Sequence, residues 1–268
     1  MNPRRRNLLT HGLLALTASF AMRPVRVAAK GSEAARCWPL SEVAPENTGP
    51  GRKFASDGKV QHFPGNTVLC RIPQPSGTFA ELNRAYGALR AEFGLEHFTW
   101  LPPNSYHMTV FDGVTDAFRR PGDWPQTLPL NATMTVCNRY VGERLRKLDL
   151  GTTLPLRMAI DDPDPSGISA AITLRPIDSA ENHRLRELRD RISAAVGIRH
   201  GDHDIYRFHT SFAYYVRQLA GDEEDKYRQA FLAIVQQLRK ALPVIELGAP
   251  EFCLFDDMYA YRTQFKLG

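Results

Sequence analysis

Two short motifs, each a histidine followed two residues later by a hydroxyl residue, could carry chemistry in this sequence. They are Tyr106-His107-Met108-Thr109-Val110 and Phe208-His209-Thr210-Ser211-Phe212. In a strand, residues i and i+2 point to the same face, so His107 should lie beside Thr109, and His209 beside Ser211. Each motif would present an imidazole, which can transfer protons near neutral pH, together with a hydrogen-bonding hydroxyl.

A motif of this kind also arises by chance, and a third copy, His97-Phe98-Thr99, has no counterpart in the second half of the chain. His107 and His209 differ because they occupy equivalent places in a repeated unit. His107 lies 35 residues after Ile72, and His209 lies 32 residues after Ile177. A matched pair in a duplicated unit favours function over a hydrogen-bonded core histidine.

The repeated unit is a run of strand, helix, strand, helix and strand. Apolar periodicity and β-branched residues predict the first unit as strands 67–72, 106–111 and 154–160 with helices 79–93 and 131–148. The second unit is predicted as strands 168–175, 206–215 and 252–259 with helices 179–196 and 222–242. The predicted fold is α+β: one domain, residues 62–268, with two pseudo-symmetric lobes at about 62–161 and 162–268.

The acidic run Asp222-Glu223-Glu224-Asp225 begins the last predicted helix. Negative charge at a helix start is stabilised by the helix dipole, so this run is interpreted as structural rather than as a ligand site.

Residues 1–29 account for the positive charge of the chain. The 268 residues include 34 Lys+Arg and 29 Asp+Glu, a net charge of +5. Five arginines and no Lys, Asp or Glu lie in residues 1–29, which leaves 29 basic and 29 acidic residues. Without a global basic surplus, a small phosphorylated substrate is expected rather than long nucleic acid. The composition excludes collagen, coiled coil, long disorder and polytopic membrane proteins.

The same segment has the layout of an export signal. A basic start precedes an apolar run from Leu8 to Met22 and the small residues Val27-Ala28-Ala29. Arg5-Arg6-Asn7-Leu8-Leu9 resembles a twin-arginine signal, which predicts a periplasmic protein without stable membrane association after cleavage. An uncleaved anchor and a mitochondrial presequence are the alternatives. Residues 30–61, rich in Gly, Pro and polar residues, are expected to form a loosely ordered lead-in.

The four cysteines, Cys37, Cys70, Cys137 and Cys253, lack the paired spacing of zinc or redox motifs. An exported compartment permits a disulfide, but the sequence does not pair them. Cys70, Cys137 and Cys253 are expected to be small core residues rather than nucleophiles.

The paired motifs resemble those of the two-histidine (2H) phosphoesterase superfamily. Lys53-Phe54-Ala55-Ser56-Asp57-Gly58 and Phe63-Pro64-Gly65-Asn66-Thr67 are similar to the lead-in of a little-characterised branch, so the similarity covers roughly residue 53 to the C-terminus. The resemblance implies two lobes whose sheets face a central cleft, with the motifs transferred onto His107/Thr109 and His209/Ser211. It also implies 2′,3′-cyclic phosphates or related 2′-5′ linkages as the substrate class.

Two imidazoles facing each other across a cleft suit a phosphodiester. In-line displacement needs a base on the attacking side of phosphorus and an acid on the leaving side, and His107 and His209 can fill these roles in either order. Thr109 and Ser211 would donate hydrogen bonds to the non-bridging oxygens. Arg207 shares the face of His209 and is either a phosphate clamp or a solvated arginine.

Two further groups of residues could contribute to the site. By strand parity, Tyr215 and Phe111 could stack on a nucleobase, although aromatic residues near strand ends are more often core. The loop His200-Gly201-Asp202-His203-Asp204 contains metal-binding residue types, but the sequence predicts no helix or strand to hold them. A solvated connection is therefore expected rather than a metal site.

Three functions follow from these residues. The favoured one is a metal-independent phosphodiesterase, a phosphoric diester hydrolase that acts as a monomer without cofactors on 2′,3′-cyclic phosphates or related small nucleotide phosphodiesters. The second is an exported protein that binds a nucleotide or phosphosugar in the same cleft without chemistry. The third is metal-dependent hydrolysis by the His200 loop. The intact histidine and hydroxyl of both motifs favour the first.

Overall fold

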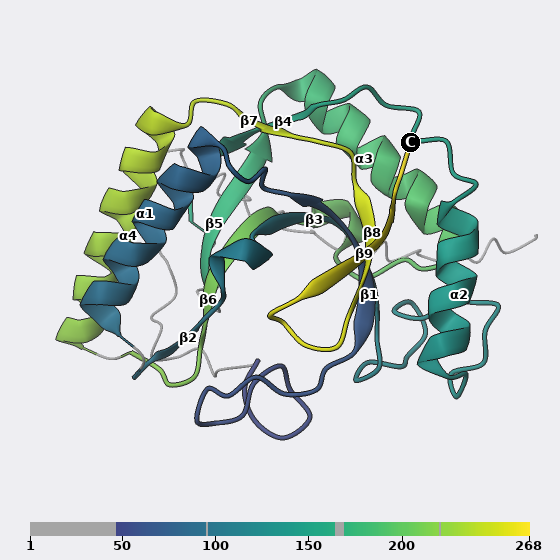
Figure 1. The fold of residues 1–268 in the computed structure, drawn as a ribbon, viewed down its shortest axis with the longest axis horizontal. Helices are drawn as coiled ribbons and strands as arrows, with labels where there is room; N and C mark the ends of the chain where they lie inside the picture. Colours follow the sequence, from purple (N-terminus) through teal and green to yellow (C-terminus); the bar gives the residue numbers. More distant parts are fainter. Residues whose placement is uncertain (1–46, 95, 164–168, 220) are drawn as a thin grey trace, which may run out of the picture. The chain divides into compact units, whose positions relative to one another are not determined.

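The described part of the chain folds around two antiparallel sheets (Figure 1). A computed structural model describes residues 47–268 except 95, 164–168 and 220. The predicted export signal, residues 1–29, lies outside the described residues, as do the rest of the lead-in up to residue 46 and Cys37. None of the described helices has the length and hydrophobicity needed to cross a membrane.

The first sheet has four strands in the order β3-β1-β8-β9, and the second has five in the order β2-β6-β5-β4-β7. The first consists of β1 (Gly65–Arg71), β3 (His107–Thr115), β8 (Glu251–Phe255) and β9 (Tyr261–Lys266). The second consists of β2 (Phe98–Trp100), β4 (Leu156–Ile160), β5 (Ser169–Pro176), β6 (Phe208–Tyr215) and β7 (Ile245–Leu247).

The two-lobed α+β fold is confirmed, but the lobes do not divide the chain near residue 161. Strands β2 and β4 come from the first half and pair with β6 and β5 of the second half. In return, β8 from the C-terminal region pairs with β1. The predicted boundaries are therefore wrong, because strands pair where hydrogen-bonding edges match and not by chain order. Strands β2, β7 and β9 were not predicted.

Helices α1 (Gly77–Phe93) and α4 (Asp222–Ala241) lie side by side, as do α2 (Met134–Leu145) and α3 (Ser179–Val196) (Figure 1). Two short 3₁₀ helices, η2 (Pro103–Ser105) and η3 (His203–Ile205), precede β3 and β6. The four long helices match the sequence prediction. The Asp178 carboxylate accepts a hydrogen bond from the Glu181 amide at 2.8 Å, which begins α3.

Aromatic packing fixes the helix pair α1/α4 against the second sheet. The Tyr86 ring of α1 lies 5.4 Å from Trp100 and 6.1 Å from Phe212, and the Tyr227 ring of α4 lies 6.0 Å from Tyr215. These ring pairs bury the face of β6 opposite His209.

The two strands that carry the histidine motifs belong to different sheets but contact each other directly. The amide of Leu101, just past β2, donates to the Phe212 carbonyl at 2.8 Å, and the Tyr106 and Phe212 rings lie 5.4 Å apart. This contact brings the two halves of the predicted site together.

The described part of the lead-in is folded, contrary to the loose order predicted for residues 30–61. The Phe54 amide donates to the Asn47 carbonyl at 3.0 Å, and the Gly49 amide donates to the Phe54 carbonyl at 2.8 Å. The Phe54 side chain is 0% exposed. It anchors a hydrophobic cluster apart from the main core, together with Phe63, Leu101, Phe255 and Met258.

The third histidine motif and the acidic run both have structural roles. Buried His97 places Nε2 3.4 Å from a carboxylate oxygen of Glu223, at the start of α4. The Thr99 hydroxyl donates to the Gly58 carbonyl at 2.8 Å and so holds the lead-in on β2. The third histidine motif and the acidic run therefore both stabilise contacts between elements. A structural role was predicted for the acidic run.

Candidate active site

A cavity of about 650 Å³ is lined by residues of both histidine strands. It brings together five residues predicted from the sequence: His107, Thr109, His209, Ser211 and Arg207. His107 and Thr109 are partly exposed in β3 while Met108 and Val110 are buried, and β6 repeats this alternation. The predicted one-sided arrangement of each motif is therefore present.

Each histidine ring is held in the same way by a backbone carbonyl two residues earlier. His107 Nδ1 lies 2.7 Å from the Ser105 carbonyl oxygen, and His209 Nδ1 lies 3.0 Å from the Arg207 carbonyl oxygen. A carbonyl only accepts hydrogen bonds, so Nδ1 carries the proton in both rings. The neutral ring then has a lone pair on Nε2, and the charged ring has a proton there to give. The sequence did not indicate these two hydrogen bonds, because every residue has a backbone carbonyl and no residue type identifies the one that accepts.

Both strands bulge just after their motifs. Thr109 pairs with Leu69 and Phe111 with Val68, which leaves Val110 as an extra residue. In β6, Ser211 pairs with Ala171 and Ala213 with Ala170, which leaves Phe212 extra. In each strand the extra residue lies three positions after the histidine, and a bulge reverses the alternation of faces beyond it.

The bulges overturn the prediction that Phe111 and Tyr215 face the cleft. Phe111 is buried against the rings of His200 and His203, and Tyr215 is buried against Tyr227. Neither residue lines the cavity, whereas the adjacent Asp112 and Tyr214 do. Strand parity predicts the faces of these residues only where a strand is unbroken, and the sequence carries no clear signal for either bulge.

Burial and neighbouring charge lower the pKa of His107. Desolvation dominates and the charge of His209 adds to it, while the hydrogen bond to Ser105 opposes both; together they lower the pKa from 6.5 to about 4. His107 is therefore neutral at pH 7, with Nε2 able to accept a proton. His107 and His209 line the same cavity, where the charge of His209 acts on the His107 ring.

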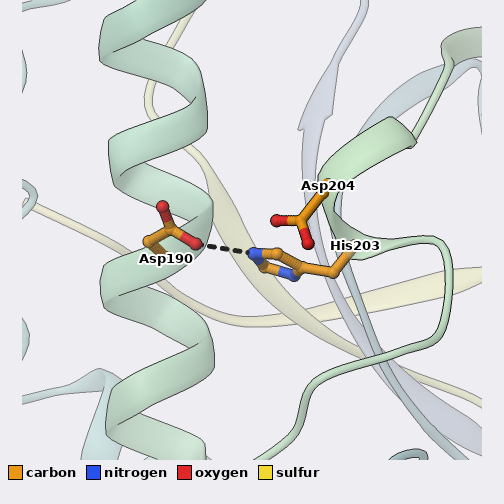
Figure 2. Close-up of side chains that lie close together, drawn as sticks. All are labelled: Asp190, His203 and Asp204. Carbon is orange, nitrogen blue, oxygen red and sulfur yellow. Dashed lines mark hydrogen bonds and ion pairs between the residues drawn. The ribbon is translucent and has the colours of Figure 1, made fainter. Parts of the chain in front are cut away.

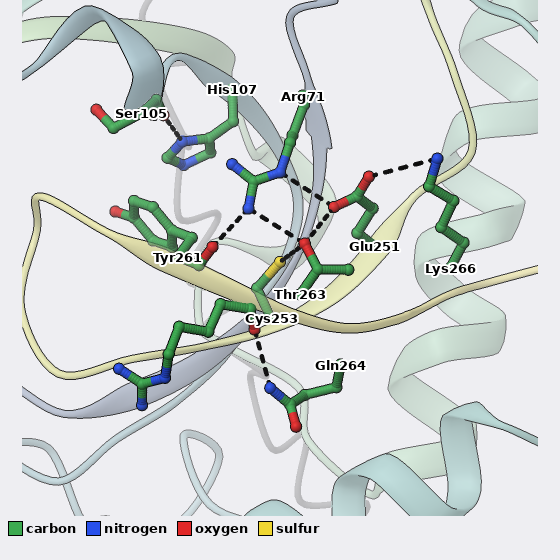
Figure 3. A network of polar contacts seen from close by, with 10 residues as sticks. Arg71, Ser105, His107, Glu251, Cys253, Tyr261, Thr263, Gln264 and Lys266 are labelled. Carbon is green, nitrogen blue, oxygen red and sulfur yellow. Dashed lines mark hydrogen bonds and ion pairs between the residues drawn. The ribbon is translucent and has the colours of Figure 1, made fainter.

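A polar network behind His107 fixes its aromatic neighbour (Figure 3). The Arg71 guanidinium donates to Glu251 at 3.1 Å, to the Tyr261 carbonyl at 2.5 Å and to Thr263 at 3.2 Å. The Tyr261 ring packs edge-on at 4.4 Å from the His107 ring. This network joins β1, β8 and β9 and limits the rotation of the imidazole.

Comparison with known proteins supplies relatives for this fold. A family model described as "2H-phosphodiest: Domain of unknown function (DUF1868)" matches residues 53–169. A crystal structure of a conserved protein of unknown function from Agrobacterium tumefaciens is similar at 26% identity and a TM-score of 0.74, covering 80% of this chain and 90% of that chain. The match places residues 53–169, which contain the first histidine motif, in the 2H phosphoesterase superfamily. Membership supports a phosphodiesterase-like function. No curated protein matches the chain.

Tyr206 is a cavity residue that the sequence did not indicate. It lines the cavity together with Thr109, and its ring lies 6.4 Å from that of His209. Burial raises its pKa well above 10, so the phenol stays protonated. Tyr206 is therefore a neighbour of the second histidine in the cavity that both motifs line.

In the loop at residues 200–204, Gly201, Asp202 and Asp204 are exposed, as expected of a solvated connection, but His203 is not. His203 is buried in η3, and its Nε2 lies 2.9 Å from an Asp190 carboxylate oxygen of α3 (Figure 2). The potential ligand atoms of Asp190, His203 and Asp204 lie within 4.8 Å of one another. Arg199 already pairs with both carboxylates, at 3.2 and 2.5 Å, and none of the three residues lines the cavity.

His200 lines the cavity, but both of its ring nitrogens have partners. Nδ1 lies 2.7 Å from an Asp123 carboxylate oxygen, and Nε2 lies 2.7 Å from the Asp112 carbonyl oxygen. Both partners are hydrogen-bond acceptors, so both ring nitrogens are already engaged and neither is directed at a metal. His200 instead connects β3 to the loop before η3.

The cysteines of the described residues are free thiols in the core, as expected. Cys70, Cys137 and Cys253 are buried, and burial raises the pKa of Cys137 to about 12. A protonated buried thiol is a poor nucleophile, so these residues are core residues rather than catalytic groups.

The low pKa of His107 predicts a pH-dependent stability. Between pH 6.5 and about 4 the unfolded chain binds the proton that the folded ring refuses, so stability falls on acidification by at most about 1.4 kcal/mol per pH unit. The variant His107→Asn keeps a donor for the Ser105 carbonyl but does not titrate, so its unfolding free energy should fall less. Urea unfolding at pH 7, 5.5 and 4.5 measures the difference, with exposed His183→Asn as control. Equal slopes for wild type and His107→Asn would contradict it.

Proposed function

We propose that this protein is a metal-independent phosphodiesterase acting on nucleoside 2′,3′-cyclic phosphates or related small nucleotide phosphodiesters. The observation that carries the proposal is the matched pair of Nδ1–carbonyl hydrogen bonds at 2.7 and 3.0 Å. They hold two imidazoles in the same tautomer in one cavity, which suits proton transfer in opposite directions by equivalent groups.

In the proposed reaction, one imidazole takes up a proton and the other gives one, so the protons balance. One Nε2 accepts a proton from water as its oxygen attacks phosphorus, and the other Nε2–H gives a proton to the leaving ribose oxygen. The P–O bond to that oxygen breaks, and a 2′- or 3′-phosphomonoester remains. The low pKa of His107 supports its role as the base in the free enzyme.

The hydroxyls of Thr109 and Ser211 are proposed to donate to the non-bridging oxygens of the phosphoryl group. Both line the cavity beside a histidine. Fixed dipoles of this kind stabilise charge that grows in the transition state. Arg207, an exposed cavity residue, is proposed to attract the anionic substrate from the rim.

Alanine at either catalytic histidine should strongly reduce turnover. Loss of one proton-transfer group lowers kcat by about 10²–10⁴, so His107→Ala and His209→Ala should each fall by that factor toward adenosine 2′,3′-cyclic phosphate. The exposed His183→Ala is the matched control and should keep wild-type turnover. Full wild-type turnover in EDTA is expected.

Tight binding of adenosine monophosphate by the wild type, with no hydrolysis of any cyclic phosphate, would instead favour the non-catalytic binding function. Activity that is lost on chelation would favour metal-dependent hydrolysis.

Removing the hydroxyl of Thr109 should slow the reaction without unfolding the protein. A lost donor to the developing charge lowers kcat by about 10–10³, so Thr109→Val should show that decrease with a smaller change in KM. Thr210→Val is the matched control because Thr210 is buried on the opposite face of the second motif. Steady-state kinetics and thermal unfolding of both variants measure the effect. Equal losses of kcat in the two variants would refute this role.

We also propose, from residues 1–29, that the folded protein is exported by the twin-arginine route and acts in the periplasm. The balanced charge of the remaining residues supports a small phosphorylated substrate, and we propose that the protein acts on it as a monomer. Replacing Arg5 and Arg6 with lysine should keep the full-length chain in the cytoplasm, because the route reads the arginine pair. Immunoblotting of cell fractions measures this, and periplasmic material at wild-type levels would contradict it.

A further inference from the structure

We propose that Lys53, which lies outside both histidine motifs, forms a second anion subsite in the cleft, one that binds a second phosphate of the substrate. This inference rests on the proposed function and narrows its substrate class. It assigns a role to the folded lead-in, which neither the histidines nor the hydroxyls explain.

The segment that carries Lys53 is held firmly against the cleft. The neighbouring Phe54 places its ring 5.3 Å from Tyr214 and 6.3 Å from Tyr259. The Lys53 carbonyl accepts a hydrogen bond from the Gln61 amide at 3.0 Å, and Thr99 holds the Gly58 carbonyl. These contacts fix the backbone from which the Lys53 side chain enters the cavity.

The ammonium of Lys53 lacks an anionic partner in the part of the chain that the structure describes. Its Nζ lies 4.8 Å from the centroid of the Tyr214 ring, and no described carboxylate lies within 4.0 Å of it. Lys59, in the same segment, is exposed and pairs with Asp57 at 2.8 Å. A half-buried cation that has only a ring face is stabilised further by an anion from the substrate.

The position of Lys53 fits a second phosphate rather than the one that reacts. Its charge contributes to the lowered pKa of His107, so it lies near the reacting groups. Its ring partner Tyr214, however, lies beyond Ser211 on β6 by about two residue rises, or about 7 Å of strand, because Phe212 between them is the extra residue of the bulge. The ammonium is thus displaced along the cleft from the hydroxyl proposed for the scissile phosphate. A nucleotide phosphorylated at both ends of its ribose presents two anions in this way.

Two matched substrates test the subsite: adenosine 2′,3′-cyclic phosphate and the same compound with a 5′-phosphate. A charged hydrogen bond to the second phosphate should give the wild type at least about a tenfold higher kcat/KM for the 5′-phosphorylated substrate. Lys53→Met should reduce this ratio to near one, and Lys53→Arg should restore part of it. Lys59→Met, which removes a charge from the same segment but not from the cavity, should keep the wild-type ratio.

Two results would overturn the proposal: a wild-type ratio near one, or a wild-type ratio that persists in Lys53→Met. Binding distinguishes these from failure of the proposed hydrolysis. If neither substrate turns over, calorimetry compares adenosine 3′,5′-bisphosphate with adenosine 3′-monophosphate. Tighter binding of the bisphosphate that depends on Lys53 but not on Lys59 supports the subsite, and equal binding of the two ligands refutes it.

Discussion

The geometry of the cleft depends on the contacts that the buried guanidinium of Arg189 makes. Arg189 is 1% exposed and comes from α3. It donates to the Val110 carbonyl at 2.5 Å and to the His203 carbonyl at 3.2 Å, and it lies 4.2 Å from the centroid of the Tyr206 ring. No carboxylate of the described residues lies within 4.0 Å of it. A buried guanidinium is stable only where hydrogen-bond acceptors surround it. Arg189 can therefore be buried only while the Val110 and His203 carbonyls keep their positions, and its hydrogen bonds in turn hold them there.

Each partner of Arg189 belongs to a different part of the site. Val110 is the extra residue of the bulge in β3, and a bulge leaves a backbone group without a partner in the sheet. Arg189 binds that carbonyl and thereby stabilises the bulge. The same side chain contacts η3 and the ring of Tyr206, which lines the cavity together with Thr109. Helix α3, from the second repeat, therefore helps to position the first histidine motif. The two repeats are joined by such side-chain contacts as well as by the strands that they exchange between the sheets.

The sequence was sufficient for whatever depends on periodicity within one element. The four helices, both histidine strands and the pairing of His107 with Thr109 and of His209 with Ser211 follow from apolar spacing alone. Features that depend on contacts between distant segments were not predictable: the pairing of β2 with β6, the bulges that bury Phe111 and Tyr215, and the carbonyl partners of the histidines. Lys53 illustrates the limit, because it lies in a segment of low periodicity whose order depends on the burial of Phe54.

In the proposed reaction, the positive charges around His107 would favour proton transfer once an anionic substrate binds. Lys53, Arg71 and His209 all disfavour a proton on His107, as does desolvation, so the free ring is neutral but weakly basic. A phosphodiester anion between the imidazoles opposes those positive charges, and the pKa of His107 then rises toward the value at which a base is most effective. Substrate charge would therefore shift the pKa of His107 in the direction that the role of a base requires.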